Sequence, residues 1–115
     1  MNGGEVYIIY GSWLTDPHDK ISLCIEHNFH WFFWFNSSQP ISGVGVPAYA
    51  GEHSAITHNC FLDIGKVLTF PPSDLQTARA RGPLADPLRA RVIAALQKPI
   101  LTITDAQRRQ ALSVI

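Results

Sequence analysis

The stretch that decides the fold is KISLCIEHNFHWFFWFN, residues 20–36. In its first half, apolar residues (Ile21, Leu23, Ile25) alternate with Ser22, Cys24 and Glu26, which is the period of a half-buried β-strand. Residues 31–35 are apolar on both faces, as expected for a central strand that is covered on both sides. Because only a short turn at Asn28 separates the two segments, we predict an antiparallel hairpin.

The aromatic half of this stretch has a second interpretation. Aromatic side chains on a strand can form a platform on which the bases of single-stranded nucleic acid stack. Five aromatic rings exposed on one strand would, however, form a large adhesive patch, so burial in the core is favoured. The aromatic strand is therefore predicted to belong to the interior of the sheet.

The segments around the hairpin also indicate strands. Residues 5–10 (EVYIIY) are β-branched and aromatic and lie between glycines, which is typical of a strand. Residues 37–54 are rich in Gly, Ser and Pro and predict a long loop with a short extended piece; loops of this length are often functional. Residues 55–70 predict two short strands around a turn at Asp63, Ile64 and Gly65.

The last third of the chain changes to a helical pattern. Residues 71–82 contain a Ser-x-x-Gln capping box and end on Gly82, and residues 104–115 contain a Thr-x-x-Gln box. Residues 86–99 begin with Asp86 as the expected N-cap and Pro87 at the first helical position. We therefore predict one α+β domain over residues 1–115, strand-rich over 1–70 and helical over 71–115.

Composition limits the function. The 115 residues carry nine basic and nine acidic side chains, so there is no global positive field for nucleic acid. Residues 1–60 contain one basic and five acidic residues, whereas residues 61–115 contain eight basic and four acidic residues. All five histidines lie in the first half, which is therefore the expected location of any acid–base chemistry.

The two cysteines, Cys24 and Cys60, cannot build a disulfide framework, and no basic, apolar secretory segment opens the sequence. We expect a cytoplasmic protein in which both cysteines are free thiols. The longest apolar run, residues 29–35, is too short to cross a bilayer, so no membrane contact is expected.

The order of several motifs resembles the PemK/MazF toxin family. The motifs are GGEVYIIYG, HDKISLCIE, DIGKVLTFPPSDL and ARGPLADPLRARVIAAL, and together they cover most of residues 3–98. The resemblance implies a small SH3-like β-barrel followed by two or three short helices. It also implies a homodimer and a cognate antitoxin-like protein as partner.

The activity implied by this resemblance is that of a toxin-like endoribonuclease of a toxin–antitoxin system. Such an enzyme cleaves single-stranded RNA through attack of the 2′-hydroxyl on the neighbouring phosphodiester, with no metal or other cofactor. Thr69 matches the family's Ser/Thr, which assists at the scissile phosphate. Lys20 occupies the position of the family's arginine and is followed by Ile21 instead of proline. Lysine supplies a point charge where arginine would supply a two-pronged donor.

The candidate catalytic residues are His18, Lys20, His58 and Thr69. His18 and Lys20 lie two residues apart and share a face if the strand begins at residue 18, so one can move a proton while the other stabilises charge on the phosphate. The alternative is a polar loop rim in which nearby aspartates pair these cations.

His58 lies in THNCFLD, residues 57–63. A zinc site there lacks closely spaced ligand pairs, and no flanking pattern marks Cys60 as a nucleophile. If the segment is a strand, Cys60 and Leu62 point inward and His58 lies at the end where the strand begins. His58 is then either a core histidine bonded to a carbonyl, which is favoured, or the acid–base partner of His18. Asp63 is most simply a turn former.

Further residues could bind the substrate. Asn36, Ser37 and Thr57 offer amide and hydroxyl donors, while Arg79 and Arg81 belong to a basic stripe on predicted helical segments. The alternatives are an ordinary strand exit and a solvated helix face. The competing function is a non-catalytic binding protein on the same barrel that poisons or regulates a protein target.

Overall fold

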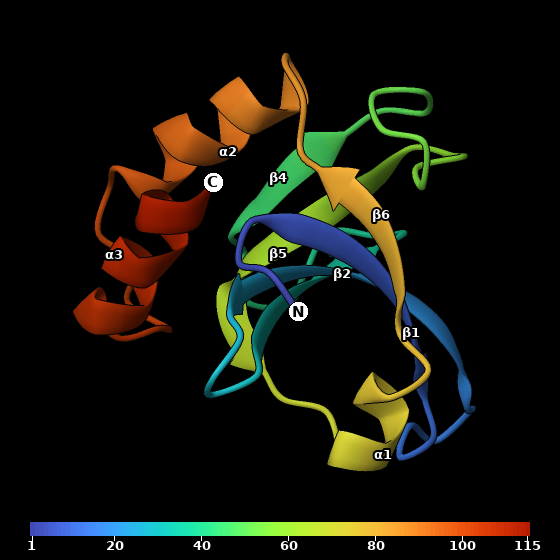
Figure 1. Ribbon diagram of the computed structural model, residues 1–115. Coiled ribbons are helices and arrows are strands. Elements are labelled where there is room, and N and C mark those ends of the chain that lie inside the picture. Colours follow the sequence, from blue (N-terminus) through green and yellow to red (C-terminus); the bar gives the residue numbers. More distant parts are fainter.

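The computed structural model describes all 115 residues and contains six strands and three helices (Figure 1). The strands are β1 (Glu5–Gly11), β2 (His18–Glu26), β3 (Trp31–Asn36), β4 (Gly45–Ala48), β5 (Cys60–Leu68) and β6 (Arg79–Pro83). The helices are α1 (Pro72–Leu75), α2 (Leu88–Leu96) and α3 (Asp105–Val114). One antiparallel sheet has the order β4-β5-β3-β2-β1-β6, which confirms the α+β class.

The predicted hairpin forms the centre of this sheet. Strands β2 and β3 pair with Leu23 opposite Phe33, and both side chains are fully buried. Strand β3 lies between β2 and β5 and buries Phe33 and Phe35 on one face and Phe32 on the other. Burial of the aromatic strand is thus confirmed over its use as a stacking platform.

The two faces of the sheet are covered differently. Helices α2 and α3 lie together over one face, where 18 buried residues, Phe33 and Leu96 among them, form the larger core (Figure 1). On the second face a smaller core contains five residues, Tyr7, Ile9, Cys24, Phe32 and Phe70. The short helix α1 contacts β1 at the edge of this second face and leaves the rest of it uncovered by helices.

The sheet is strongly curved (Figure 1), but it is not closed, because β4 and β6 are its two edges and do not pair. The loop after β4 nevertheless reaches β6. There the buried side chain of His53 places its Nε2 3.3 Å from the carbonyl oxygen of Gly82. This side-chain contact, and no strand ladder, connects the two edges of the sheet.

Residues 55–70 do not form two strands around a turn, as the sequence predicted, but contribute one continuous strand, β5. Asp63 is a buried member of this strand, and its Oδ1 accepts hydrogen bonds of 2.9 Å from Ser42 Oγ and from the Gly65 amide. A Cβ atom at Gly65 would lie 2.5 Å from Ser42 Oγ. The glycine therefore permits close approach of the 37–44 loop and is not part of a turn.

The predicted helix over residues 71–82 is also wrong in part. Only the four residues of α1 are helical, with Pro71 as N-cap and no side-chain cap. The chain then becomes β6, so that Arg79 and Arg81 lie on a strand and strands extend beyond residue 70. The physical reason is the open edge of β1, with which β6 pairs; such pairing outweighs a local helical pattern.

The last two predicted helices are confirmed. Helix α3 begins with a complete capping box in which Thr104 and Gln107 bond reciprocally to backbone amides. Helix α2 begins at Leu88 with Pro87, not Asp86, in the cap position. Its residues Leu88, Val92 and Leu96 are fully buried on one face. None of the three helices has the length and apolar character needed to cross a bilayer.

Candidate functional site

The candidate site is built around Lys20, which projects from β2 onto the second face of the sheet. Its Nζ donates to Asn36 Oδ1 at 2.9 Å and to the Phe35 carbonyl oxygen at 3.4 Å. The ammonium also lies 4.7 Å from the ring centroid of Trp34. Partial burial lowers the pKa of Lys20 below its usual range. Antiparallel pairing of β2 and β3 therefore fixes one cation at a defined place near the end of the sheet.

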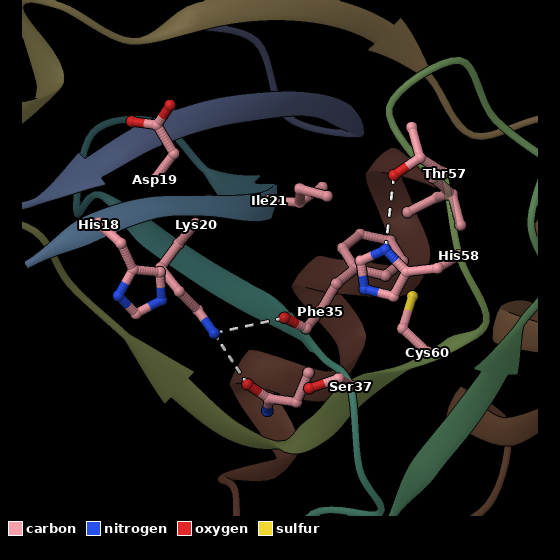
Figure 2. Close-up of a pocket in the computed structure, with 11 residues that line it drawn as sticks. His18, Asp19, Lys20, Ile21, Phe35, Ser37, Thr57, His58 and Cys60 are labelled. Atoms are coloured by element: carbon pink, nitrogen blue, oxygen red, sulfur yellow. Dashed lines mark hydrogen bonds between the residues drawn. The ribbon is translucent and has the colours of Figure 1, made fainter. Parts of the chain in front are cut away.

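Next to Lys20 is a small cavity that we call the histidine pocket (Figure 2). It lies where β2 begins, β3 ends and β5 begins. Six predicted site residues line it: His18, Lys20, Asn36, Ser37, Thr57 and His58. Its volume of about 160 Å³ is below the range of roughly 300–1,000 Å³ typical of ligand pockets. It has room for a small group such as a phosphate, but not for a whole nucleotide.

The two histidines of this pocket face it from opposite sides and do not contact each other (Figure 2). His18 Nδ1 lies 2.5 Å from the Asp16 carbonyl oxygen; since a carbonyl oxygen only accepts, Nδ1 is the donor of this contact, and Nε2 has no hydrogen-bond partner. His58 is exposed, with Nδ1 3.4 Å from Thr57 Oγ1. The favoured expectation of a buried, carbonyl-bonded His58 is wrong. That role belongs to His53, which no sequence pattern marked.

An ion pair balances the acidic wall of the histidine pocket. Asp19 lines the pocket, and its Oδ2 lies 2.8 Å from Nη2 of Arg79, which reaches it across β1 from β6. Arg79 thus places a cation at the rim of the pocket. Arg81 lies two residues further along β6, where it is exposed and forms no ion pair.

A second cavity, which we call the lysine pocket, shares Lys20, Asn36 and Ser37 with the histidine pocket. Its volume is about 570 Å³, within the usual range for small-molecule sites. Its other walls include residues that the sequence did not single out as site residues: Trp34, Ser42, Asp63, Gly65 and Lys66. The glycine- and serine-rich loop was the available signal, because residues 37–42 of that loop all line this pocket.

Thr69 is not brought together with Lys20 and the histidines. It is exposed just after β5 and lines a third cavity with Trp13 and Phe70. This third cavity shares Leu68 with the lysine pocket. Thr69 therefore lies on the far side of the lysine pocket from His18.

Both cysteines are free thiols, as predicted, and both are buried. Burial raises the pKa of the Cys24 thiol to about 11 and also raises the pKa of Cys60, which borders the histidine pocket. Neither thiol is therefore a good nucleophile at neutral pH. No three side chains of the His, Cys, Asp or Glu type come together in an arrangement that could hold a metal ion.

Comparison with known proteins adds no relative: no family model, no curated protein and no solved structure matches this chain. The evidence for function is therefore the geometry of the two adjoining pockets. Beside it stands only the order of motifs in residues 3–98, which resembles that of the PemK/MazF toxin family.

Proposed function

We propose that this protein binds single-stranded RNA at the end of the sheet and cleaves it without a metal ion, as toxin-like endoribonucleases do. The observation that carries the proposal is the fixed ammonium of Lys20 in a pocket with an imidazole on each side. Cleavage by a 2′-hydroxyl needs a base, an acid and a group that stabilises charge on the phosphorus. His18, His58 and Lys20 are residue types suited to these three tasks.

In the proposed reaction, Nε2 of His18 takes the proton of the 2′-hydroxyl, whose oxygen attacks the adjacent phosphorus. His58 donates a proton to the leaving 5′-oxygen, and Lys20 stabilises the negative charge on the phosphate oxygens. The products are a 2′,3′-cyclic phosphate and a 5′-hydroxyl. Because Asn36 uses its Oδ1 for Lys20, its amide nitrogen remains free to donate to the phosphate.

The local charges support an anionic substrate, although the whole chain is neutral. Lys66 lines the lysine pocket and forms no ion pair, so it adds positive charge near Lys20, while Arg79 neutralises Asp19 at the rim of the histidine pocket. Ser37 and Thr57 supply hydroxyl donors on the walls of the histidine pocket. We assign Thr69 and Arg81 contacts with RNA beyond the scissile phosphate.

We further propose that the curved sheet is an opened form of the SH3-like barrel implied by the PemK/MazF resemblance. The bond between His53 and Gly82, which connects the loop after β4 to β6, supports this view. A cytoplasmic homodimer with an antitoxin-like partner completes the proposal, on the strength of the resemblance alone.

The test is incubation of the pure protein with a mixed RNA in EDTA, followed by analysis of the new ends. We expect fragments that end in 2′,3′-cyclic phosphate and begin with 5′-hydroxyl. Lys20→Met keeps the packing of the stem but removes the charge, and should abolish most of the cleavage. Lys98→Met makes the same change at an exposed position outside both pockets and should leave cleavage intact. RNA that stays uncut at equimolar protein would refute the proposal.

A second function is favoured by one observation: Lys20 already donates to Asn36 and to the Phe35 carbonyl, so its role can be to shape a binding surface. The protein would then poison or regulate a protein target without cutting RNA. Expression in bacteria separates the two functions. Growth arrest that persists in Lys20→Met would favour non-catalytic binding, whereas its loss together with RNA cleavage would favour the ribonuclease.

A further inference from the structure

Asp63 is a nearly buried carboxylate with only one of its oxygens in use. It is 7% exposed, and both of its hydrogen bonds, from Ser42 Oγ and from the Gly65 amide, go to Oδ1. Oδ2 has no hydrogen-bond partner. Since Asp63 lines the lysine pocket, Oδ2 is an acceptor available to a ligand there.

This acceptor is held rigidly. Asp63 lies in the middle of β5, opposite Trp34 of β3 on one side and Gly45 of β4 on the other. The two hydrogen bonds to Oδ1 fix the carboxylate further. A preorganised acceptor of this kind discriminates strongly between ligands, because a ligand that offers no donor leaves it unpaired.

The other walls of the lysine pocket suit the phosphate of a nucleotide. Lys20 and Lys66 both line it, and Lys66 is exposed and forms no ion pair. Two ammonium groups offset the charge of Asp63 and can contact phosphate oxygens. The volume of about 570 Å³ is sufficient for one nucleotide.

We infer that the lysine pocket binds a guanine nucleotide of the RNA, with Asp63 Oδ2 accepting from the guanine N1–H and N2–H groups. Proteins commonly read unstacked RNA bases through their Watson–Crick edges. Guanine presents two neighbouring donors on that edge. Adenine and cytosine present a ring-nitrogen acceptor beside their amino group, and uracil presents one N–H between two carbonyls, so these bases place acceptors against the carboxylate. The inference rests on the proposed function, since it names the base that a ribonuclease site would select.

The test is calorimetric titration of the protein with each of the four ribonucleoside 3′-monophosphates. We expect guanosine 3′-monophosphate to bind about tenfold more tightly than each of the others, at the lower end of the discrimination given by a good base contact. Equal affinities for the four nucleotides would overturn the inference.

Asp63→Asn is the most informative variant. The Gly65 amide requires an acceptor, so the asparagine oxygen should stay at Oδ1 and its NH₂ should replace Oδ2. The guanine preference should then disappear, and cytidine 3′-monophosphate, which offers neighbouring acceptors, should bind more tightly than before. A guanine preference that survives Asp63→Asn overturns the inference. Asp105→Asn, the same change at an exposed site on α3, should leave all four affinities unchanged.

If Asp63→Asn does not fold, as judged by its thermal unfolding, Lys66→Met still tests the pocket, because Lys66 is exposed. It should weaken all four nucleotides by a similar factor and keep the order of affinity; an unchanged affinity would overturn the inference. Failure of the proposed function gives a different result: guanosine 3′-monophosphate binds, yet RNA in EDTA remains intact. Cleavage without any preference for guanine would keep the ribonuclease and reject the role of Asp63.

Discussion

The two faces of the sheet differ in how completely their polar groups are satisfied. The face under α2 and α3 carries the larger core, with Leu23 and Phe33 fully buried. The second face carries Lys20, Asp63 and two buried polar atoms without partners, Ser22 Oγ and Trp34 Nε1. Buried polar groups without hydrogen bonds reduce stability. Such departures from good packing concentrate at functional sites, which supports the proposal that the first face supplies stability while the polar groups of the second take part in binding.

The largest expected effect tests the stability side of this comparison. Phe33→Ala should lower the free energy of unfolding by about 3–5 kcal/mol, because it leaves a cavity in the larger core. Phe70→Ala, on the second face, should cost clearly less, since Phe70 borders an open cavity that water can fill. Urea unfolding measures both. Phe29→Ala, at a residue that is 65% exposed, serves as the control. Equal losses for Phe33 and Phe70 would remove the distinction between the faces.

The next effect tests the chemistry of the histidine pocket. His18→Ala and His58→Ala should each reduce RNA cleavage by about 10²–10⁴-fold, the usual contribution of a general acid or base. The double variant should lose little more than the worse single variant, because both histidines serve one reaction. Rates from single-turnover assays decide this. His27→Ala, at an exposed histidine outside both pockets, should keep full activity. Losses that multiply in the double variant would show that the two residues act independently.

The smallest effect concerns the dependence of stability on pH. Burial lowers the pKa of Lys20 in the folded protein, so the folded state holds this proton less tightly than the unfolded state does. Stability should therefore rise with pH over the interval between the folded pKa and the unfolded value near 10.5. Thermal unfolding of the parent and of Lys20→Met across that interval should show a slightly flatter curve for the variant. Identical curves would mean that folding does not alter the affinity of Lys20 for its proton.

The sequence predicts well those parts of the molecule that depend on local periodicity. Alternation over residues 20–26 predicts β2, and its extension to His18 places that histidine on the side of Lys20. The Thr104 capping box predicts the start of α3. Each of these features depends on residues within a few positions of one another.

Other parts depend on contacts between distant segments and could not be predicted. Residues 79–83 become a strand because β1 has an open edge, so the helical pattern around Ser73 misleads. Asp63 has the sequence context of a turn former, but it lies inside the continuous strand β5, so the sequence does not predict the lysine pocket. The resemblance alone predicts Thr69 at the active site, whereas the structure puts it in another cavity.

One measurement tests most directly the proposal that RNA binds around the two pockets at the end of the sheet. A 2′-O-methylated RNA, which lacks the attacking hydroxyl and cannot be cleaved, is titrated into the ¹⁵N-labelled protein, and amide chemical shifts are followed. We expect the shifts to concentrate on residues around the two pockets, from His18 to Lys20, from Asn36 to Ser42 and at Lys66. Shifts confined to α2 and α3, or no shifts at all, would contradict the proposal that RNA binds around these pockets.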